Sequence, residues 1–209
     1  MELNKIYNCD CLEFMKTLPD KCIDLCLTDP PYGIGIDGQK EQYCKNPKHN
    51  RKKHDFKGWD NVIPSIEVFK EIFRVSKNQI IWGGNYFVEY LESHKCWLYW
   101  DKGQDGLTMS DGELAYTSFD TPLRAIKINR CELIKDNTKH PTQKPLRLGT
   151  WILEKYAKEG DIIFDPFAGS GTFLVSAQNL GFKYIGCELD KDYFEIAEKR
   201  LGFIKQRLF

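Results

Sequence analysis

The sequence predicts an α/β protein with a mainly parallel β-sheet. Short apolar runs that end in Asp, Gly or Pro alternate with segments of helical periodicity, which is the pattern of strands joined by crossover helices. The chain has 209 residues, of which 42% are hydrophobic and 29% charged, so it can bury a substantial core. No internal repeat is visible, and we predict a single domain over residues 1–209.

Seven segments have the length and composition of strands. They are residues 5–8, 23–28, 79–82, 96–100, 114–118, 162–165 and 184–188. Five segments have helical periodicity, namely residues 11–18, 66–75, 143–158, 172–180 and 191–204. The third of these helices has Pro145 in its first turn and Gly160 as its stop, and both residues are favourable at such positions.

Two stretches interrupt this alternation. Residues 33–63 form a long connection with little apolar periodicity, and loops of this length are usually functional or disordered. Between Asp37 and Asp60, seven basic residues outnumber four acidic ones, which gives a local charge of +3. Residues 120–139 form a shorter, mildly basic stretch. Basic loops of this kind suit phosphate groups, although solvated charged loops without a partner are also common.

The whole chain has 30 basic and 30 acidic residues, so its net charge indicates no partner. The first ten residues lack the apolar core of a signal peptide, and no apolar run is long enough for a membrane span, which predicts a cytoplasmic protein. Eight cysteines show no paired spacing and are expected to be reduced thiols. Cys44, His49 and His54 share one loop, but the loop lacks C-x-x-C spacing, so we predict no metal site.

The most informative segment is Asp29-Pro30-Pro31-Tyr32, which directly follows an apolar run. Proline has no backbone N–H and a fixed φ, so two consecutive prolines form a stiff corner that offers carbonyl acceptors and almost no donors. The Asp29 carboxylate adds an acceptor, and the Tyr32 ring offers a flat surface for stacking. Such a site suits the exocyclic amino group of a nucleobase, and a rigid turn without a ligand is the alternative.

A second motif, residues 164–172, has the pattern of a strand, a glycine turn and a helix start. Glycine lets a ligand approach the backbone, and a helix N-terminus directs free N–H groups towards it. The dinucleotide-binding pattern fails, because Leu174 stands at the position of its third glycine. The next predicted strand ends at Glu188, whose carboxylate can bind a ribose diol or simply be solvated. Both motifs follow strands and should meet at the carboxyl edge of the sheet.

Together, residues 29–32 and residues 164–172 resemble the S-adenosylmethionine-dependent DNA amino-methyltransferases. The tetrapeptide precedes the glycine loop, which is similar to the circularly permuted β group of that family. Residues 140–145, with the sequence His-Pro-Thr-Gln-Lys-Pro, are a further hallmark of the group. Three other segments also look family-like: residues 8–12, 81–85 and 110–118. The resemblance implies a three-layer, doubly wound, Rossmann-like fold of the class I methyltransferases with a mostly parallel, seven-stranded sheet.

The resemblance also implies a role for each motif. The tetrapeptide of Asp29, Pro30, Pro31 and Tyr32 would be catalytic, and S-adenosylmethionine would be the cofactor, with S-adenosylhomocysteine as the product. Contacts to this cofactor are implied as follows: Gly169 and Gly171 to its methionine part, Glu188 to its ribose, Asp10 and Cys11 to its adenine, and Lys144 to its carboxylate. The other implied cofactor contacts are Asp29, Asp165, Phe167, Ser170 and Thr172.

In the implied reaction, Asp29 and the Pro30 carbonyl accept hydrogen bonds from the target amino group and aim its lone pair at the activated methyl group. The target base has to leave the duplex, and Tyr32 would be its stacking face. Asp at the first position of the tetrapeptide favours N6 of adenine, with N4 of cytosine as the alternative. Two further hypotheses are a catalytically idle DNA-binding protein of the same fold and a methyltransferase for RNA or protein glutamine.

Double-stranded DNA is the partner that the resemblance implies. Basic residues of the long loop would contact its phosphates, namely Lys45, Lys48, Arg51, Lys52 and Lys53. Residues 120–139 would be a short target-recognition segment, where many relatives have a larger region. Target choice would then involve the long loop or a second subunit, because members of the family often form homodimers.

Overall fold

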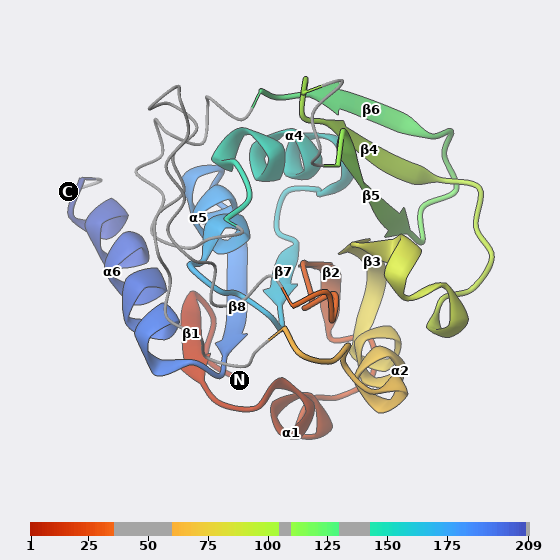
Figure 1. The fold of residues 1–209 in the computed structure, drawn as a ribbon. Helices are drawn as coiled ribbons and strands as arrows, with labels where there is room; N and C mark the ends of the chain where they lie inside the picture. Colours follow the sequence, from red (N-terminus) through yellow and green to blue (C-terminus); the bar gives the residue numbers. More distant parts are fainter. Residues whose placement is uncertain (36–59, 105–109, 130–142, 208–209) are drawn as a thin grey trace.

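The computed structural model describes residues 1–35, 60–104, 110–129 and 143–207 (Figure 1). Within these ranges the strands form one eight-stranded sheet in the order β1-β8-β7-β2-β3-β5-β4-β6. The strands are β1 (Lys5–Asn8), β2 (Ile23–Thr28), β3 (Ser76–Trp82), β4 (Trp97–Asp101), β5 (Gly112–Thr117), β6 (Arg124–Lys127), β7 (Ile162–Asp165) and β8 (Lys183–Glu188). The helices are α1 (Cys11–Lys16), α2 (Ile66–Val75), α4 (Leu146–Tyr156), α5 (Thr172–Asn179) and α6 (Lys191–Arg207), with short 3₁₀ turns η2 (Gly84–Tyr86) and η3 (Val88–Tyr90).

The sheet is mostly parallel, as the sequence predicted. The strands β1, β8, β7, β2 and β3 are neighbours and all run in one direction. The strand β5 is antiparallel to both β3 and β4, and β4 is parallel to β6. The predicted α/β class is therefore confirmed.

The predicted number of seven strands is wrong for the described residues, because the edge strand β6 is an eighth. It lies within residues 120–139, which the sequence indicated only as a target-recognition segment. This strand is four residues long, and Arg124, Ala125 and Lys127 in it are exposed. A short edge strand that buries little has no apolar alternation, so the periodicity of the sequence does not reveal it.

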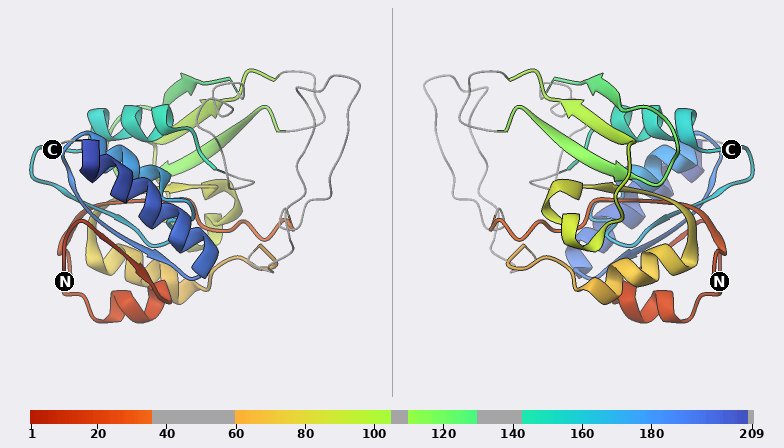
Figure 2. Two further views of the ribbon diagram at one scale, coloured as in Figure 1. Left: turned by 90° about the vertical axis from the view of Figure 1, so that its left-hand side faces the viewer. Right: turned by 90° about the vertical axis from the view of Figure 1, so that its right-hand side faces the viewer.

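Helices cover both faces of the sheet and complete the predicted three layers. The helices α1 and α2 pack against each other on one face, where Phe69 and Ile72 enter a buried cluster with residues of β2 and β3. The helices α4, α5 and α6 pack on the opposite face, where Ile152 and Phe173 enter a second buried cluster. Figure 2 shows the two groups of helices on opposite sides of the strands. None of the helices in the described ranges has the length and apolar character needed to cross a bilayer.

The helix α4 is shorter at both ends than the sequence predicted. Pro145 is its N-cap with extended backbone, so the helix begins at Leu146, one residue after the proline. It ends at Tyr156, and Ala157 is its C-cap. Gly160 does not stop the helix, because it lies in the turn before β7 with φ +89°.

The carboxyl edge of the sheet gathers the ends of five parallel strands, β1, β8, β7, β2 and β3. The strand β4 ends at this same edge, because it is antiparallel to β5, which is antiparallel to β3. For the same reason β5 begins there, at Gly112 and Glu113. Open α/β sheets bind their ligands at this edge.

Candidate active site

The stiff corner predicted from the sequence follows the last residue of β2, Thr28. Thr28 and Pro30 are buried, whereas Asp29, Pro31 and Tyr32 are partly exposed. The two prolines contribute no N–H donor to this corner. The corner therefore presents the Asp29 carboxylate and the Tyr32 ring beside a set of backbone acceptors.

Asp29 belongs to a cluster of charges drawn from four parts of the chain. The Lys144 ammonium, which precedes α4, forms an ion pair with Asp29 Oδ2 and lies 3.0 Å from Glu113 Oε2. The Lys102 ammonium, which follows β4, lies 2.6 Å from Glu113 Oε1. The Tyr32 hydroxyl donates to Asp29 Oδ1 at 2.5 Å. The Lys144 side chain is only 6% exposed, so the two carboxylates rather than water compensate its charge.

The cluster shifts the pKa values of its members. Burial raises the pKa of Asp29, and the opposing effect of the Lys144 ammonium does not cancel this rise, to which Glu113 also contributes. Burial also acts to raise the pKa of Glu113, but Lys144 and Lys102 outweigh it and lower this pKa to about 2. Burial acts to lower the pKa of Lys144, but Asp29 and Glu113 outweigh it and raise this pKa. Lys144 and Glu113 are therefore charged at neutral pH, and Asp29 is the carboxylate that protonates more easily.

The Tyr32 ring stacks on Tyr86 of η2, with a centroid separation of 4.8 Å and an interplanar angle of 14°. Gly83 also lies against the Tyr32 ring, and a Cβ at this position would be 2.1 Å from Cε1 of Tyr32. Gly83 also has φ +70°, which favours glycine. The sequence indicated Tyr32 alone as a stacking face, whereas the structure forms a stacked pair whose outer member, Tyr86, is 43% exposed.

The second motif forms the turn from β7 to α5, directly beside the corner, because β7 pairs with β2. The Thr28 hydroxyl donates to Asp165 Oδ1 at 2.8 Å, and the Phe167 N–H donates to the same oxygen at 3.1 Å. Burial raises the pKa of Asp165 to about 7, although these two hydrogen bonds oppose the rise. Gly169, with φ +52°, makes the tight turn that follows. Asp165 thus connects the two motifs.

Glu188, the last residue of β8, closes the glycine turn. Its Oε2 accepts from the Gly169 N–H at 2.7 Å, and its Oε1 accepts from the Asp190 N–H at 2.8 Å. Burial raises the pKa of Glu188, and the same backbone donors oppose this rise. A carboxylate oxygen has two lone pairs, so Glu188 can still accept hydrogen bonds from a ligand hydroxyl.

The end of β1 supplies Asp10 and Cys11 beside Glu188. Asp10 is the N-cap of α1, and its Oδ1 accepts from the backbone N–H groups of Leu12 and Glu13. The Asn8 side-chain amide donates to the Glu188 carbonyl at 2.8 Å and fixes the adjacent strand end. Burial raises the pKa of Cys11 to about 12, so its thiol is neutral and behaves as an apolar surface.

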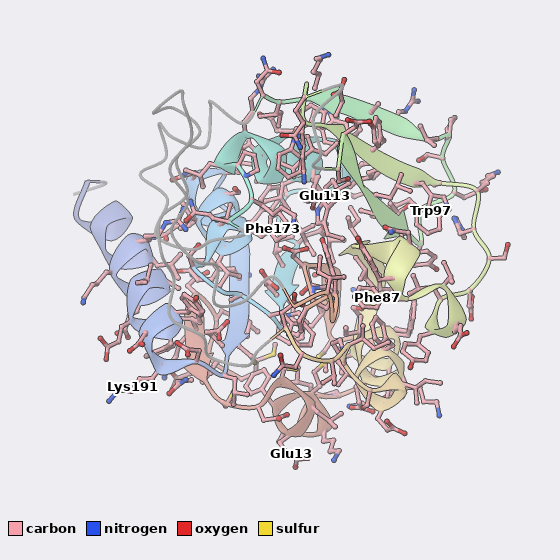
Figure 3. The ribbon with its side chains drawn as sticks, viewed as in Figure 1. Glu13, Phe87, Trp97, Glu113, Phe173 and Lys191 are labelled. Carbon is pink, nitrogen blue, oxygen red and sulfur yellow. The ribbon has the colours of Figure 1, made fainter. Side chains whose placement is uncertain are left out.

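A cavity of about 1730 Å³ joins all these groups. Glu113, Phe173 and Lys191, labelled in Figure 3, border it from β5, α5 and α6. The predicted site residues that line it are Asp10, Cys11, Asp29, Pro30, Pro31, Tyr32, Lys144, Asp165, Phe167, Gly169, Ser170, Thr172 and Glu188. Two motifs more than a hundred residues apart in the sequence therefore open into one space.

Gly171 is the predicted site residue of this turn that does not line the cavity. It is the N-cap of α5 with φ +79°, and a Cβ there would lie 3.0 Å from Cβ of Ala197 in α6. The absence of a side chain at Gly171 thus serves the turn and the packing of α6.

A comparison with known protein families decides what this cavity belongs to. Residues 81–199, more than half of the chain, match the N6/N4 methyltransferase family, described as DNA methylase. The chain belongs to this DNA methylase family. The matched region contains Glu113, Lys144 and the glycine turn, all of which border the cavity.

Two curated proteins are similar in sequence to the methylase. It is 28% identical over 252 residues to the type II methyltransferase M.HinfI of Haemophilus influenzae, an alignment that covers 97% of this chain and 69% of the relative. A shorter stretch of 63 residues is 54% identical to the type II methyltransferase M2.DpnII of Streptococcus pneumoniae, and covers 30% of this chain and 24% of that protein.

Solved structures share the fold of the methylase. The complex of M1.HpyAVI with SAM superposes with a TM-score of 0.62 at 24% identity, and covers 94% of this chain and 98% of the other. The cytosine-N4-specific PvuII DNA methyltransferase superposes with a TM-score of 0.61 at 16% identity, and covers 94% and 85% of the two chains. These similarities support the class I methyltransferase fold that the resemblance implied.

The sequence did not indicate a role for two residues that line the cavity, Glu113 and Lys102, or for Arg200, which contacts the cavity residue Ser170. Glu113 and Lys102 lie at the ends of β5 and β4, and only the antiparallel pairing of β5 brings them to the carboxyl edge. Arg200 of α6 donates to the Ser170 carbonyl at 2.6 Å and to the Ser170 hydroxyl at 3.0 Å, so it fastens the glycine turn. A basic residue in the middle of a helix gives no sequence signal for such a contact.

Several predicted residues of the methylase lie outside the described ranges. They include the predicted DNA-binding residues Lys45, Lys48, Arg51, Lys52 and Lys53 and residues 130–139 of the recognition segment. Cys44, His49 and His54, for which no metal site was predicted, also lie outside these ranges. The described residues contain no group of three or more His, Cys, Asp or Glu side chains arranged to hold a metal ion.

Proposed function

We propose that this methylase transfers a methyl group from S-adenosylmethionine to the exocyclic N6 amino group of adenine in double-stranded DNA, after the base has left the helix. One observation carries the proposal: the acceptor-rich corner at Asp29 and the glycine turn at Gly169 follow adjacent parallel strands and border the same cavity. Transfer between two bound molecules needs their sites to be this close.

The corner is suited to an amino group that is a poor nucleophile. The lone pair of an aromatic amine is shared with its ring, so acceptors that hold both N–H groups localise the lone pair and aim it. Asp29 supplies a carboxylate, and Pro30 supplies a carbonyl in a segment without N–H donors. Tyr32 and Tyr86 border the same cavity and offer aromatic surface to a flat ring.

The other end of the cavity fits an adenosine-type cofactor. When bound, S-adenosylmethionine supplies a methyl group already activated by a positive sulfonium. Glu188 has free acceptor capacity for the ribose hydroxyls, and Asp10 and Cys11 border the adjacent wall, where an adenine would lie. Gln143, which lines the cavity near the turn, has a buried Nε2 without an acceptor among the described residues.

Adenine is proposed rather than cytosine because the first residue of the tetrapeptide is Asp29. Contact with DNA is proposed for the basic residues of the long loop, with double-stranded DNA as the partner and residues 120–139 as the recognition segment. Phosphate contacts of this type position the duplex without reading its sequence, so they predict affinity that falls steeply with salt. A homodimer would offer a second set of contacts.

The test is to incubate the protein with S-adenosylmethionine carrying a labelled methyl group and with duplex DNA of mixed sequence. The DNA is digested to nucleosides, and the methylated base is identified by mass spectrometry, while methylation-sensitive sequencing locates it. N6-methyladenine in a fixed sequence context is the expected product. N4-methylcytosine would overturn the choice of base.

A competition arm separates the other substrates. An excess of untagged duplex DNA should suppress the labelling of a biotin-tagged duplex, whereas an equal mass of RNA should not. Folded protein that binds the cofactor but labels no duplex would reject the proposed activity and favour an idle DNA-binding protein. Label in RNA or in protein glutamine would redirect the proposal to those substrates.

A further inference from the structure

The charge cluster at Asp29 forms a chain of alternating sign, in the order Asp29, Lys144, Glu113 and Lys102. Its members come from the end of β2, the segment before α4, the start of β5 and the end of β4. Three of them, Lys144, Glu113 and Lys102, have no part in the proposed contacts to the base. A buried ammonium and a nearly buried carboxylate are costly to place, so their position beside Asp29 needs an explanation.

Both oxygens of the Asp29 carboxylate are already engaged. Oδ2 accepts from the Lys144 ammonium, and Oδ1 accepts from the Tyr32 hydroxyl at 2.5 Å. Each oxygen keeps one further lone pair, so an amino group held by Asp29 would take its place there in competition with the donor already bound. Lys144 cannot move to water without leaving its buried position, because its side chain is 6% exposed.

Glu113 offers these donors a second acceptor. Its Oε2 lies 3.0 Å from the Lys144 ammonium and 3.4 Å from the Tyr32 hydroxyl. Lys102 holds the other oxygen, Oε1, at 2.6 Å and so orients the carboxylate. A donor that is released by Asp29 can therefore remain fully paired on Glu113 without being exposed to water.

On the basis of the proposed function, we propose that Glu113 is a positioning residue that takes over Lys144 when the target amino group enters, so that Asp29 becomes free to accept from that group. Lys144 stays charged and buried during the exchange, and it occupies the acceptor of Asp29 while the base is absent. Lys102 keeps Glu113 in the orientation that this exchange needs.

The charged and titratable groups that face Asp29 make the proposal testable by pH. They are Lys144, Glu113, Tyr32 and Asp165, and Lys102 acts through Glu113. After burial, Lys144 has the largest influence and lowers the pKa of Asp29, whereas Glu113 raises it. Loss of the Lys144 charge should therefore raise the pKa of Asp29, and loss of the Glu113 charge should lower it.

The experiment compares full-length Lys144→Met and Glu113→Gln variants with the wild type in steady-state methylation over a range of pH. Both should reduce kcat by about tenfold or more, because one loses the placement of Asp29 and the other leaves Lys144 bound to it. Cofactor affinity, measured by calorimetry, should be unchanged in Glu113→Gln. The acid limb of the kcat profile should move to higher pH in Lys144→Met and to lower pH in Glu113→Gln.

The matched control is Glu13→Gln, which makes the same change from carboxylate to amide in an exposed ion pair with Lys16 on α1. It should keep the wild-type profile. The double variant Lys144→Met with Glu113→Gln keeps the net charge of the cluster, and its loss in kcat should be smaller than the product of the two single losses.

Shifts of the acid limb in the same direction, or no shift in either variant, would overturn the proposal while leaving the methylation of DNA intact. Failure of the wild type to methylate DNA would instead reject the proposed function. If Lys144→Met does not fold, Glu113→Gln decides alone: wild-type kcat and an unmoved acid limb in that variant would refute the exchange.

Discussion

The hydroxyl of Thr28 donates to the buried carboxylate of Asp165 at a distance of 2.8 Å. Thr28 is the residue immediately before Asp29, and Asp165 is the last residue of β7, where the glycine turn begins. The two residues are 137 positions apart in the sequence, yet their bond joins the acceptor corner to the turn. This buried contact, together with the pairing of β2 with β7, fixes the separation of the two halves of the cavity.

Asp165 makes the stability of the protein depend on pH. Its pKa is about 7 in the folded state, against 3.8 for an ordinary Asp. Between these values the unfolded chain releases the proton and the folded chain keeps it, so the contribution of Asp165 to stability falls as pH rises. In Asp165→Asn this dependence is removed, while the amide can still accept from Thr28. The unfolding free energy of the variant minus that of the wild type should therefore increase by at most about 4 kcal/mol between about pH 4 and about pH 8.

Urea denaturation of both proteins at several pH values measures this difference. The effects of all other titrating groups cancel in the comparison to a first approximation. A difference in unfolding free energy that stays constant over this range would show that Asp165 titrates normally.

Gly83→Ala should disrupt the corner through the Tyr32 ring. The new Cβ would lie 2.1 Å from this ring, which cannot remain stacked on Tyr86 in its present place. Gly181→Ala is the matched control, because Gly181 also has a positive φ, +79°, and a Cβ there would have no atom within 4 Å. This control therefore measures only the backbone strain of an alanine at positive φ, about 1–2 kcal/mol. Gly83→Ala should unfold at a lower temperature than Gly181→Ala and should lose methylation. Equal melting temperatures and full activity would contradict the contact.

Arg200→Gln should weaken the cofactor site without touching the acceptor corner. It removes the guanidinium that donates to the carbonyl and hydroxyl of Ser170, so the glycine turn loses its link to α6. We expect about a tenfold rise in the dissociation constant of S-adenosylmethionine and little change of kcat at saturation. The exposed neighbour Lys199 provides the control Lys199→Gln. An unchanged dissociation constant in Arg200→Gln would show that Arg200 does not support the cofactor site.

The sequence was sufficient to predict the meeting of the two motifs. Each follows a strand of a mainly parallel sheet, and all carboxyl ends of such strands lie at one edge. The register of Cys26 with Phe164 confirms that the strands before the two motifs are neighbours. The chemistry of the two motifs therefore predicts which side chains the site contains. The parallel topology predicts that they lie at the carboxyl edge of the sheet.

The partners of Lys144 could not be predicted in the same way. Glu113 reaches the cavity because β5 runs antiparallel to β3, and no local pattern reports the direction of a strand. Lysine is usually exposed, so the burial of Lys144 depends on the two carboxylates that surround it. The stack of Tyr86 on Tyr32 depends likewise on the left-handed turn at Gly83. The glycine is visible in the sequence, but the direction in which the chain turns there is not.

Asp29→Ala separates the two functions of the cavity most directly. Calorimetric titration with S-adenosylmethionine and methyl transfer to duplex DNA are measured on the same preparation. Because Asp29 follows β2, whereas Glu188 ends β8 and β7 lies between these two strands, transfer should fall below detection while the dissociation constant of the cofactor changes by less than about threefold. Retained transfer, or a parallel loss of cofactor binding, would show that Asp29 does not hold the target amino group.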